Sequence, residues 1–123
     1  MGTSEIYQAV EALSEVLDSL IIDLELLGRE SFMPLFVVLQ AGSSLDDALK
    51  QQIKNKIRQD VSPRHVPDEI IVIEEVPYTL SGKKMEVPIR KILLGQNVQI
   101  VANPGAMRNP NAIQFFVDLA GKL

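Results

Sequence analysis

The stretch VPYTLSGKK, at 76–84, holds the residues of this sequence whose types and spacing best suit chemistry. After its proline, Thr79 and Ser81 can hydrogen-bond the local backbone, and Gly82 permits a positive φ. Such a turn would fix the direction in which Lys83 points. A lysine on a turn is most often only solvated. An ammonium group held in one place, however, can orient or offset the negative charge of a phosphoryl group during transfer.

Other kinds of catalytic site are less well supported. A Walker phosphate loop needs a glycine where Pro77 stands and a hydroxyl residue where Lys84 stands, and this turn lacks the further glycines of such a loop. His65 has no evident orienting partner nearby in the sequence, so we interpret it as a structural or solvated histidine. No serine lies in a nucleophile elbow, so a self-contained hydrolase is not predicted.

Length, charge and composition exclude several broad functions. The chain has 123 residues, the size of one domain, and its net charge of −4 argues against nucleic acid or an anionic membrane as a partner. With no cysteine and one histidine, no metal site is predicted, and a reducing cytosol is compatible with the composition. The sequence shows neither a membrane-length apolar run nor a signal-peptide pattern. We therefore expect a cytoplasmic domain.

The elements that must position the turn are predicted from capping residues and apolar periodicity. A first helix should begin at Thr3 or Ser4. The segment 16–26 is expected to be a strand, with a helix as the alternative because its periodicity is mixed. MPLFVVLQ should form a strand that pairs with it through a short turn. The next helix should be capped by Ser43 or Ser44, and DEIIVIEEV should form a third strand.

After the lysine turn, the sequence predicts two further helices. Pro88 suits the start of one helix, and Asn109 followed by Pro110 should cap the last one; NVQIV between them could add a short edge strand. The order of elements predicts an α+β domain with a small sheet of about three main strands flanked by helices. Residues 1–95 would form its core, and 96–123 a tail that carries the last helix within the same domain.

Several segments resemble the mobile C-terminal domain of the adenylate-forming enzymes, the family of the AMP-forming acyl-CoA synthetases. The final core motif of that family, Pro-x-Thr-x-Ser-Gly-Lys, is matched at every fixed position from Pro77 to Lys83. GTSEIYQAVEAL resembles the family's Gly-Thr-x-Glu-Ile-Glu helix, with Tyr7 in place of the second acidic residue. SPRHVPDEI and KMEVPIRKIL most resemble the members that activate acetoacetate, whereas other short-chain members tend to have a basic residue where Glu86 stands.

The resemblance implies a role for the lysine turn. These enzymes join a carboxylate to ATP and then pass the acyl group to CoA, and their small C-terminal domain swings over a large N-terminal domain between the steps. Lys83 is therefore the expected catalytic residue, contacting the carboxylate and the α-phosphate during adenylation. Thr79, Ser81 and Gly82 would shape its turn. Lys84 would point elsewhere, into solvent.

The resemblance also implies substrates and partners. It places Arg58 on an arginine that meets a CoA phosphate in the acetyl-CoA synthetase branch; a helix-end cation that favours the helix dipole is an equally good interpretation. Acetoacetate, ATP and CoA are the implied substrates, and the missing N-terminal domain is the implied partner and the expected site of Mg²⁺. This chain alone should hold no cofactor tightly and should be inactive. The alternatives are the same domain of an acetyl- or propionyl-CoA synthetase, and a non-catalytic interaction module with this fold.

Overall fold

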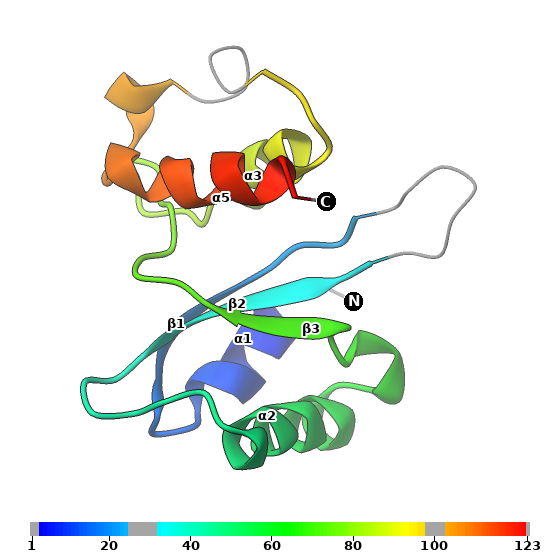
Figure 1. The fold of residues 1–123 in the computed structure, drawn as a ribbon. Coiled ribbons are helices and arrows are strands. Elements are labelled where there is room, and N and C mark those ends of the chain that lie inside the picture. Colours follow the sequence, from blue (N-terminus) through cyan, green and yellow to red (C-terminus); the bar gives the residue numbers. More distant parts are fainter. Residues whose placement is uncertain (1–2, 25–31, 98–102, 123) are drawn as a thin grey trace.

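A small sheet lies between two layers of helices in the computed structural model, which describes residues 3–24, 32–97 and 103–122 (Figure 1). One face of the sheet is covered by α1 and α2, and the other face by α3 and α5. The α+β fold predicted from the sequence is therefore confirmed.

The sheet has three strands in the order β1-β2-β3. β1 (Val16–Ile21) pairs antiparallel with β2 (Pro34–Leu39), and β2 pairs parallel with β3 (Glu69–Val72). The first strand ends at Ile21, before the predicted end at position 26. The Ile22 N–H still donates to the Pro34 carbonyl at 3.2 Å and an isolated bridge pairs Leu24 with Phe32, while positions 25 and 26 lie outside the described residues. The helical alternative for this segment is wrong.

The central strand β2 is apolar on both faces because each face of the sheet is covered by helices. On β2, Phe36 and Val38 pack toward α3 and α5, whereas Leu35 and Val37 pack toward α1 and α2. This alternation follows from the two-residue period of a strand. It produces a hydrophobic core on each side of the sheet.

The helices of the first layer are α1 (Thr3–Glu11) and α2 (Asp47–Asp60). The helix α2 is capped by Asp46, whose carboxylate accepts a hydrogen bond from the Leu49 N–H at 2.8 Å. The predicted capping residues, Ser43 and Ser44, lie in the irregular segment before the helix, so that prediction was wrong. Aspartate and serine are about equally good caps, and the local pattern offers both.

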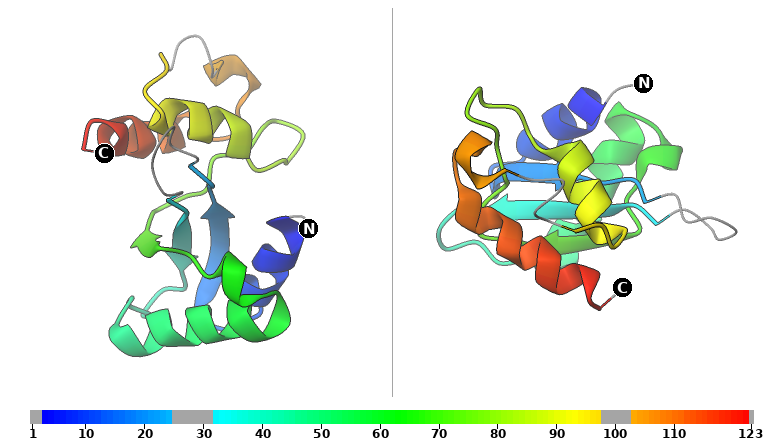
Figure 2. Two further views of the ribbon diagram at one scale, coloured as in Figure 1. Left: turned by 90° about the vertical axis from the view of Figure 1, so that its right-hand side faces the viewer. Right: turned by 90° about the horizontal axis from the view of Figure 1, so that it is seen from above.

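The second layer consists of α3 (Glu86–Leu93) and α5 (Ile113–Ala120), which pack against each other on the same face of the sheet (Figure 2). Pro88 lies in the first turn of α3, as expected. Phe116 of α5 is fully buried, and its ring centroid lies 4.9 Å from that of Phe36. The described part of the tail thus contributes to the core beneath it.

The start of the last helix differs from the prediction. A short 3-10 turn, Pro110–Ala112, precedes α5, and the Asn109 side chain makes no capping hydrogen bond. Its amide instead bonds to backbone groups of the lysine turn. The predicted edge strand NVQIV falls largely on residues 98–102, outside the described residues. Among the described helices, none has the length and apolar content needed to cross a membrane.

Candidate functional site: a lysine hairpin anchored on the sheet edge

The residues of the lysine turn form a short hairpin. Tyr78 and Lys84 close it as an isolated antiparallel bridge. At its tip, the Thr79 N–H donates to the Lys83 carbonyl at 2.9 Å, and the Lys83 N–H donates to Thr79 Oγ1 at 3.1 Å. Both backbone polar groups of Lys83 are therefore bonded to Thr79, which holds the backbone of Lys83 in place.

The remaining residues of the motif complete the turn. The Gly82 N–H donates to the Thr79 carbonyl at 2.9 Å, and Gly82 has a φ of 87°, which glycine adopts without the steric cost of a Cβ. Ser81 Oγ lies 2.9 Å from Thr79 Oγ1. The hydroxyl residues thus bond within the hairpin and keep it compact.

The Lys83 side chain extends from this hydrogen-bonded tip. It is exposed, and within the described parts of the chain its ammonium makes no hydrogen bond or ion pair. The neighbouring Leu80 is 64% exposed. The hairpin therefore presents a lysine and an apolar side chain outward from the domain.

Lys84 has very different surroundings, and the prediction that it is solvated is wrong. Its Nζ lies 2.7 Å from Glu11 Oε2, 3.4 Å from Asp18 Oδ1 and 2.7 Å from the Ser19 carbonyl oxygen. The same ammonium lies 3.5 Å from the centroid of the Tyr7 ring, and the side chain is only 17% exposed. A charge taken this far out of water needs such partners to offset its lost hydration.

Asp18 holds both stems of the hairpin. Its Oδ2 accepts a hydrogen bond from Tyr78 Oη at 2.7 Å, while its Oδ1 faces Lys84. The pairing register of β1 shifts between Val16 and Asp18. Such irregularities commonly re-aim a side chain, and here the carboxylate reaches the two residues that close the hairpin.

The same cluster protects the free edge of the sheet. β1 is an edge strand, and three backbone groups on its open side are bonded to side chains. The Ser19 N–H donates to Asp18 Oδ1 at 2.9 Å, the Ser19 carbonyl accepts from Lys84, and the Ile21 N–H donates to Tyr7 Oη at 3.2 Å. An unpaired strand edge would otherwise be open to pairing with another chain.

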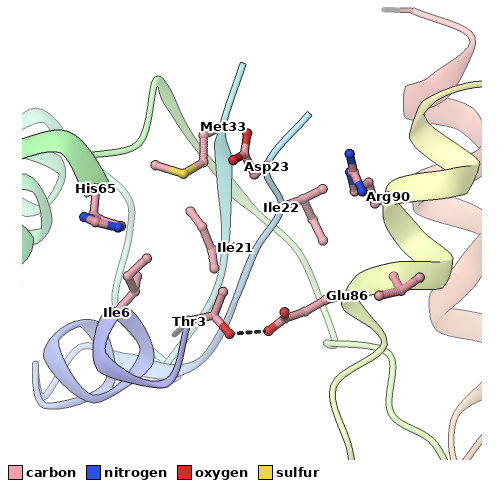
Figure 3. Close-up of a pocket in the computed structure, with 10 residues that line it drawn as sticks. Thr3, Ile6, Ile21, Ile22, Asp23, Met33, His65, Glu86 and Arg90 are labelled. Carbon is pink, nitrogen blue, oxygen red and sulfur yellow. Dashed lines mark hydrogen bonds between the residues drawn. The ribbon is translucent and has the colours of Figure 1, made fainter. Parts of the chain in front are cut away.

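The two departures from the family pattern contact each other. Tyr7 Oη donates to Glu86 Oε2 at 2.5 Å. Thr3 Oγ1 donates to the same oxygen at 3.0 Å, the hydrogen bond drawn in Figure 3. Burial, reinforced by the hydrogen bond to Glu86, raises the pKa of Tyr7 well above its usual value. The sequence showed each departure separately, but the hydrogen bond between the two residues was not predicted. An acidic residue is absent at position 7 and present at position 86, and this exchange could have indicated that the two positions are neighbours.

A surface pocket of about 460 Å³ lies beside this pair, between α1, β1 and α3 (Figure 3). His65 lines it, with its Nδ1 2.6 Å from Ser62 Oγ, as do Glu86 and Arg90 from α3. His65 therefore has a hydroxyl partner three residues away in the sequence. Within residues 3–24, 32–97 and 103–122, no cluster of three or more His, Cys, Asp or Glu side chains could hold a metal ion.

Arg58 lies apart from the lysine hairpin. It is in the last turn of α2, exposed, with its Nη1 3.3 Å from Asn55 Oδ1. The helix α2 covers one face of the sheet, while the hairpin leads into α3 on the other face (Figure 1). The structure therefore does not bring Arg58 and Lys83 into one site.

The fold and the hairpin define the class of protein. Residues 6–83 match the family described as AMP-binding enzyme C-terminal domain, and the chain belongs to this family. The resemblance identified from the sequence is thus confirmed.

Individual relatives belong to a narrower group than the family as a whole. The chain is 41% identical over 121 residues to the acetoacetyl-coenzyme A synthetase of Rhizobium meliloti (strain 1021), covering 97% of this chain and 18% of that protein. It is 37% identical over 118 residues to the acetoacetyl-CoA synthetase of Caenorhabditis elegans, covering 95% and 16%. The solved acetoacetyl-CoA synthetase from Streptomyces lividans is similar with a TM-score of 0.92 and 46% identity, covering 99% of this chain and 18% of that one. The chain therefore spans less than a fifth of the length of these relatives.

Proposed function

We propose that this chain is the mobile C-terminal domain of an acetoacetyl-CoA synthetase and that it supplies Lys83 to the adenylation step. The observation that carries the proposal is the contrast at the hairpin tip. The backbone of Lys83 is fixed by Thr79, while its ammonium group extends outward from the domain. A lysine mounted in this way suits a site completed by a second domain.

In the proposed reaction, a carboxylate oxygen of acetoacetate attacks the α-phosphorus of ATP, and pyrophosphate leaves. The Lys83 ammonium orients the carboxylate and offsets the negative charge that builds up on the α-phosphate oxygens. The thiol of CoA then attacks the carbonyl carbon of the acetoacetyl-adenylate, and AMP leaves. ATP, Mg²⁺ and the acyl pocket belong to the N-terminal domain, which is the proposed partner, and the lack of cysteine supports a cytosolic location.

Arg58 is the proposed contact for a CoA phosphate in the second step, since its guanidinium can bond phosphate oxygens through paired donors. Its separation from Lys83 supports this assignment. A domain that rotates between the two steps would present the hairpin side for adenylation and the α2 side for thioester formation.

The test uses a fusion enzyme in which this chain replaces the matching C-terminal segment of the Streptomyces lividans acetoacetyl-CoA synthetase. Acetoacetate-dependent ATP–pyrophosphate exchange reports adenylation, and thioester formation from preformed acetoacetyl-adenylate reports the second step. In Lys83→Ala, exchange should fall by at least about 100-fold while thioester formation is retained. Lys91→Ala, which removes an exposed lysine of α3, is the matched control.

The outcomes separate the alternatives. Exchange that survives Lys83→Ala would contradict the proposal and favour the non-catalytic interaction module. A second fusion, to the N-terminal domain of an acetyl-CoA synthetase, tests the branch. If that fusion were the more active of the two, each assayed with its own acid, the acetyl- or propionyl-CoA synthetase alternative would replace the acetoacetate assignment.

A further inference from the structure

Two adjacent lysines of the hairpin have opposite surroundings. Lys83 is exposed at the tip, whereas Lys84 is largely buried against Glu11, Asp18 and the Tyr7 ring. The ammonium group of Lys84 makes internal contacts, and Lys84 is adjacent to the proposed catalytic lysine. It can therefore influence the direction in which Lys83 points.

We propose that Lys84 is a positioning residue for Lys83: its ammonium, held by Glu11 and Asp18, fastens the hairpin to α1 and β1 so that Lys83 extends in one direction. This inference rests on the proposed adenylation role of Lys83. It assigns Lys84 no contact with a substrate.

The geometry of the anchor supports positioning. Asp18 binds one stem of the hairpin through Tyr78 Oη and the other through Lys84 Nζ, so both stems are tied to one carboxylate of the sheet. Lys84 is the nearer tie, because consecutive Cα atoms lie only about 3.8 Å apart. A displacement of Lys84 is therefore transmitted almost directly to the Lys83 backbone.

A second set of contacts holds the hairpin on its other side. On its other side, the Leu80 N–H donates to the Ala106 carbonyl at 3.0 Å, and the Arg108 N–H donates to the Tyr78 carbonyl at 3.0 Å. These bonds reach the first stem and the start of the tip. The stem that carries Lys83 and Lys84 is bonded to the first stem where the Met85 N–H donates to the Pro77 carbonyl at 3.1 Å, and Met85 itself is buried. On the tip side of Met85, the Lys84 ammonium ties this stem to α1 and β1.

The test compares Lys84→Met and Lys84→Arg in the fusion enzyme. Methionine keeps the apolar stem but loses the charge. Because misplacing a reacting group by about 1 Å can cost about 100-fold, Lys84→Met should lower the kcat of pyrophosphate exchange about 10- to 100-fold. The KM values for ATP and acetoacetate, and thioester formation from the preformed adenylate, should stay within about twofold of the parent enzyme, as expected for a loss confined to one transition state. Lys84→Arg should restore most of the exchange, since a guanidinium can bond the same carboxylates and stack on the Tyr7 ring.

The control is Lys56→Met, which breaks the ion pair between Lys56 and Asp60 at 2.8 Å on α2, away from the hairpin. It should leave both half-reactions unchanged. Equal losses in the two half-reactions of Lys84→Met, or an unchanged exchange rate, would overturn the positioning role and leave Lys84 as a cap of the sheet edge.

A second readout does not depend on activity or on a single variant. Amide hydrogen exchange of the peptide over 77–85 should accelerate in Lys84→Met, which removes the ammonium, and by a smaller factor in Asp18→Asn, which removes one of the two carboxylates that hold it. Asp18→Asn preserves the size of the side chain and serves if Lys84→Met fails to fold. Unchanged protection of this peptide in a folded variant would overturn the proposal.

The two proposals fail in different ways. If Lys83→Ala retains pyrophosphate exchange, the adenylation role itself is wrong. If Lys83→Ala abolishes exchange and Lys84→Met leaves it intact, only the positioning role is wrong.

Discussion

The side chain of Asn109 is hydrogen-bonded to the backbone of Tyr78, in the stem of the lysine hairpin. Its Oδ1 accepts from the Tyr78 N–H at 3.0 Å, and its Nδ2 donates to the Val76 carbonyl at 2.8 Å. These two backbone groups flank Pro77, which has no N–H of its own. Asn109 thus supplies the hydrogen-bond partners of these two backbone groups, which no neighbouring strand pairs in the described part of the chain. It also links the chain after α3 to the hairpin.

Replacing Asn109 with alanine should therefore destabilise the chain. The Tyr78 N–H and the Val76 carbonyl would each lose a partner in a half-buried setting, at a cost of about 1–3 kcal/mol in the free energy of unfolding. Urea denaturation of the 123-residue chain measures this cost. The neighbouring exposed Asn111 is the control, and Asn111→Ala should change stability by less than about 0.5 kcal/mol. Equal effects of the two variants would contradict the role assigned to Asn109.

Phe116→Ala tests whether residues 96–123 form one domain with residues 1–95, as we propose. Phe116 is fully buried against Phe36, so its removal should cost about 3–5 kcal/mol. Phe115 is 40% exposed, and Phe115→Ala should cost clearly less. Urea unfolding should remain a single transition in both variants. A separate early transition for the tail, or a small loss in Phe116→Ala, would indicate that the tail is not part of the same cooperative unit.

Comparing Gly82→Ala with Gly42→Ala should separate the stability cost of alanine at a positive φ from an effect on catalysis. Gly82 and Gly42 have nearly equal positive φ values, 87° and 86°, so alanine at either position should cost about 1–2 kcal/mol. At Gly82 a Cβ would also lie 2.8 Å from Arg108 Nη2, whereas at Gly42 it would meet no atom within 4 Å among the described residues beyond its two chain neighbours. The Arg108 side chain can move aside, so the extra cost in stability should be small.

The two glycine variants should differ in activity. In the fusion enzyme, Gly82→Ala should lower pyrophosphate exchange by about tenfold or more, because it shifts the backbone next to Lys83. Gly42→Ala should leave exchange near the parent value. If both variants were equally active, the exact shape of the turn would not matter for the proposed step.

Alkaline pH should destabilise the chain through its tyrosines. Burial, with hydrogen bonds to Glu86 and Asp18 respectively, raises the pKa of Tyr7 and of Tyr78 above the ordinary value of 10.0. In the unfolded chain both ionise near pH 10, while in the folded chain they keep their protons. Above about pH 10 the unfolded state therefore binds fewer protons than the folded state, and stability falls as pH rises.

The measurement is the free energy of unfolding from neutral pH to about pH 11, compared with that of a Tyr7→Phe/Tyr78→Phe double variant. The variant should be less stable at neutral pH but should lose less stability above about pH 10, which also controls for the titration of lysines. The chain has only these two tyrosines, so tyrosinate absorbance reports on them directly. Tyrosinate that appears near pH 10 in the folded chain would contradict the raised pKa values.

Much of the architecture and the lysine turn followed from local properties of the sequence. Apolar runs of strand length, capping residues and helical periodicity predicted the three strands and the flanking helices, although the cap of α2 fell on Asp46 where Ser43 or Ser44 was expected. The residue types from Pro77 to Lys83 were sufficient to predict a compact turn that fixes the direction of Lys83. These features depend on residues a few positions apart, which the sequence displays directly.

Only the tertiary structure decided how the turn is anchored. Lys84 looked solvated because its partners, Glu11 and Ser19, lie 73 and 65 positions away. The Tyr7–Glu86 pair spans 79 positions, and Asn109, whose sequence context reads as a helix cap, bonds instead to backbone 31 and 33 positions away. Local conformational preference acts within a few residues, whereas the burial of a charge and the choice among competing hydrogen-bond partners depend on which distant segments the fold brings together.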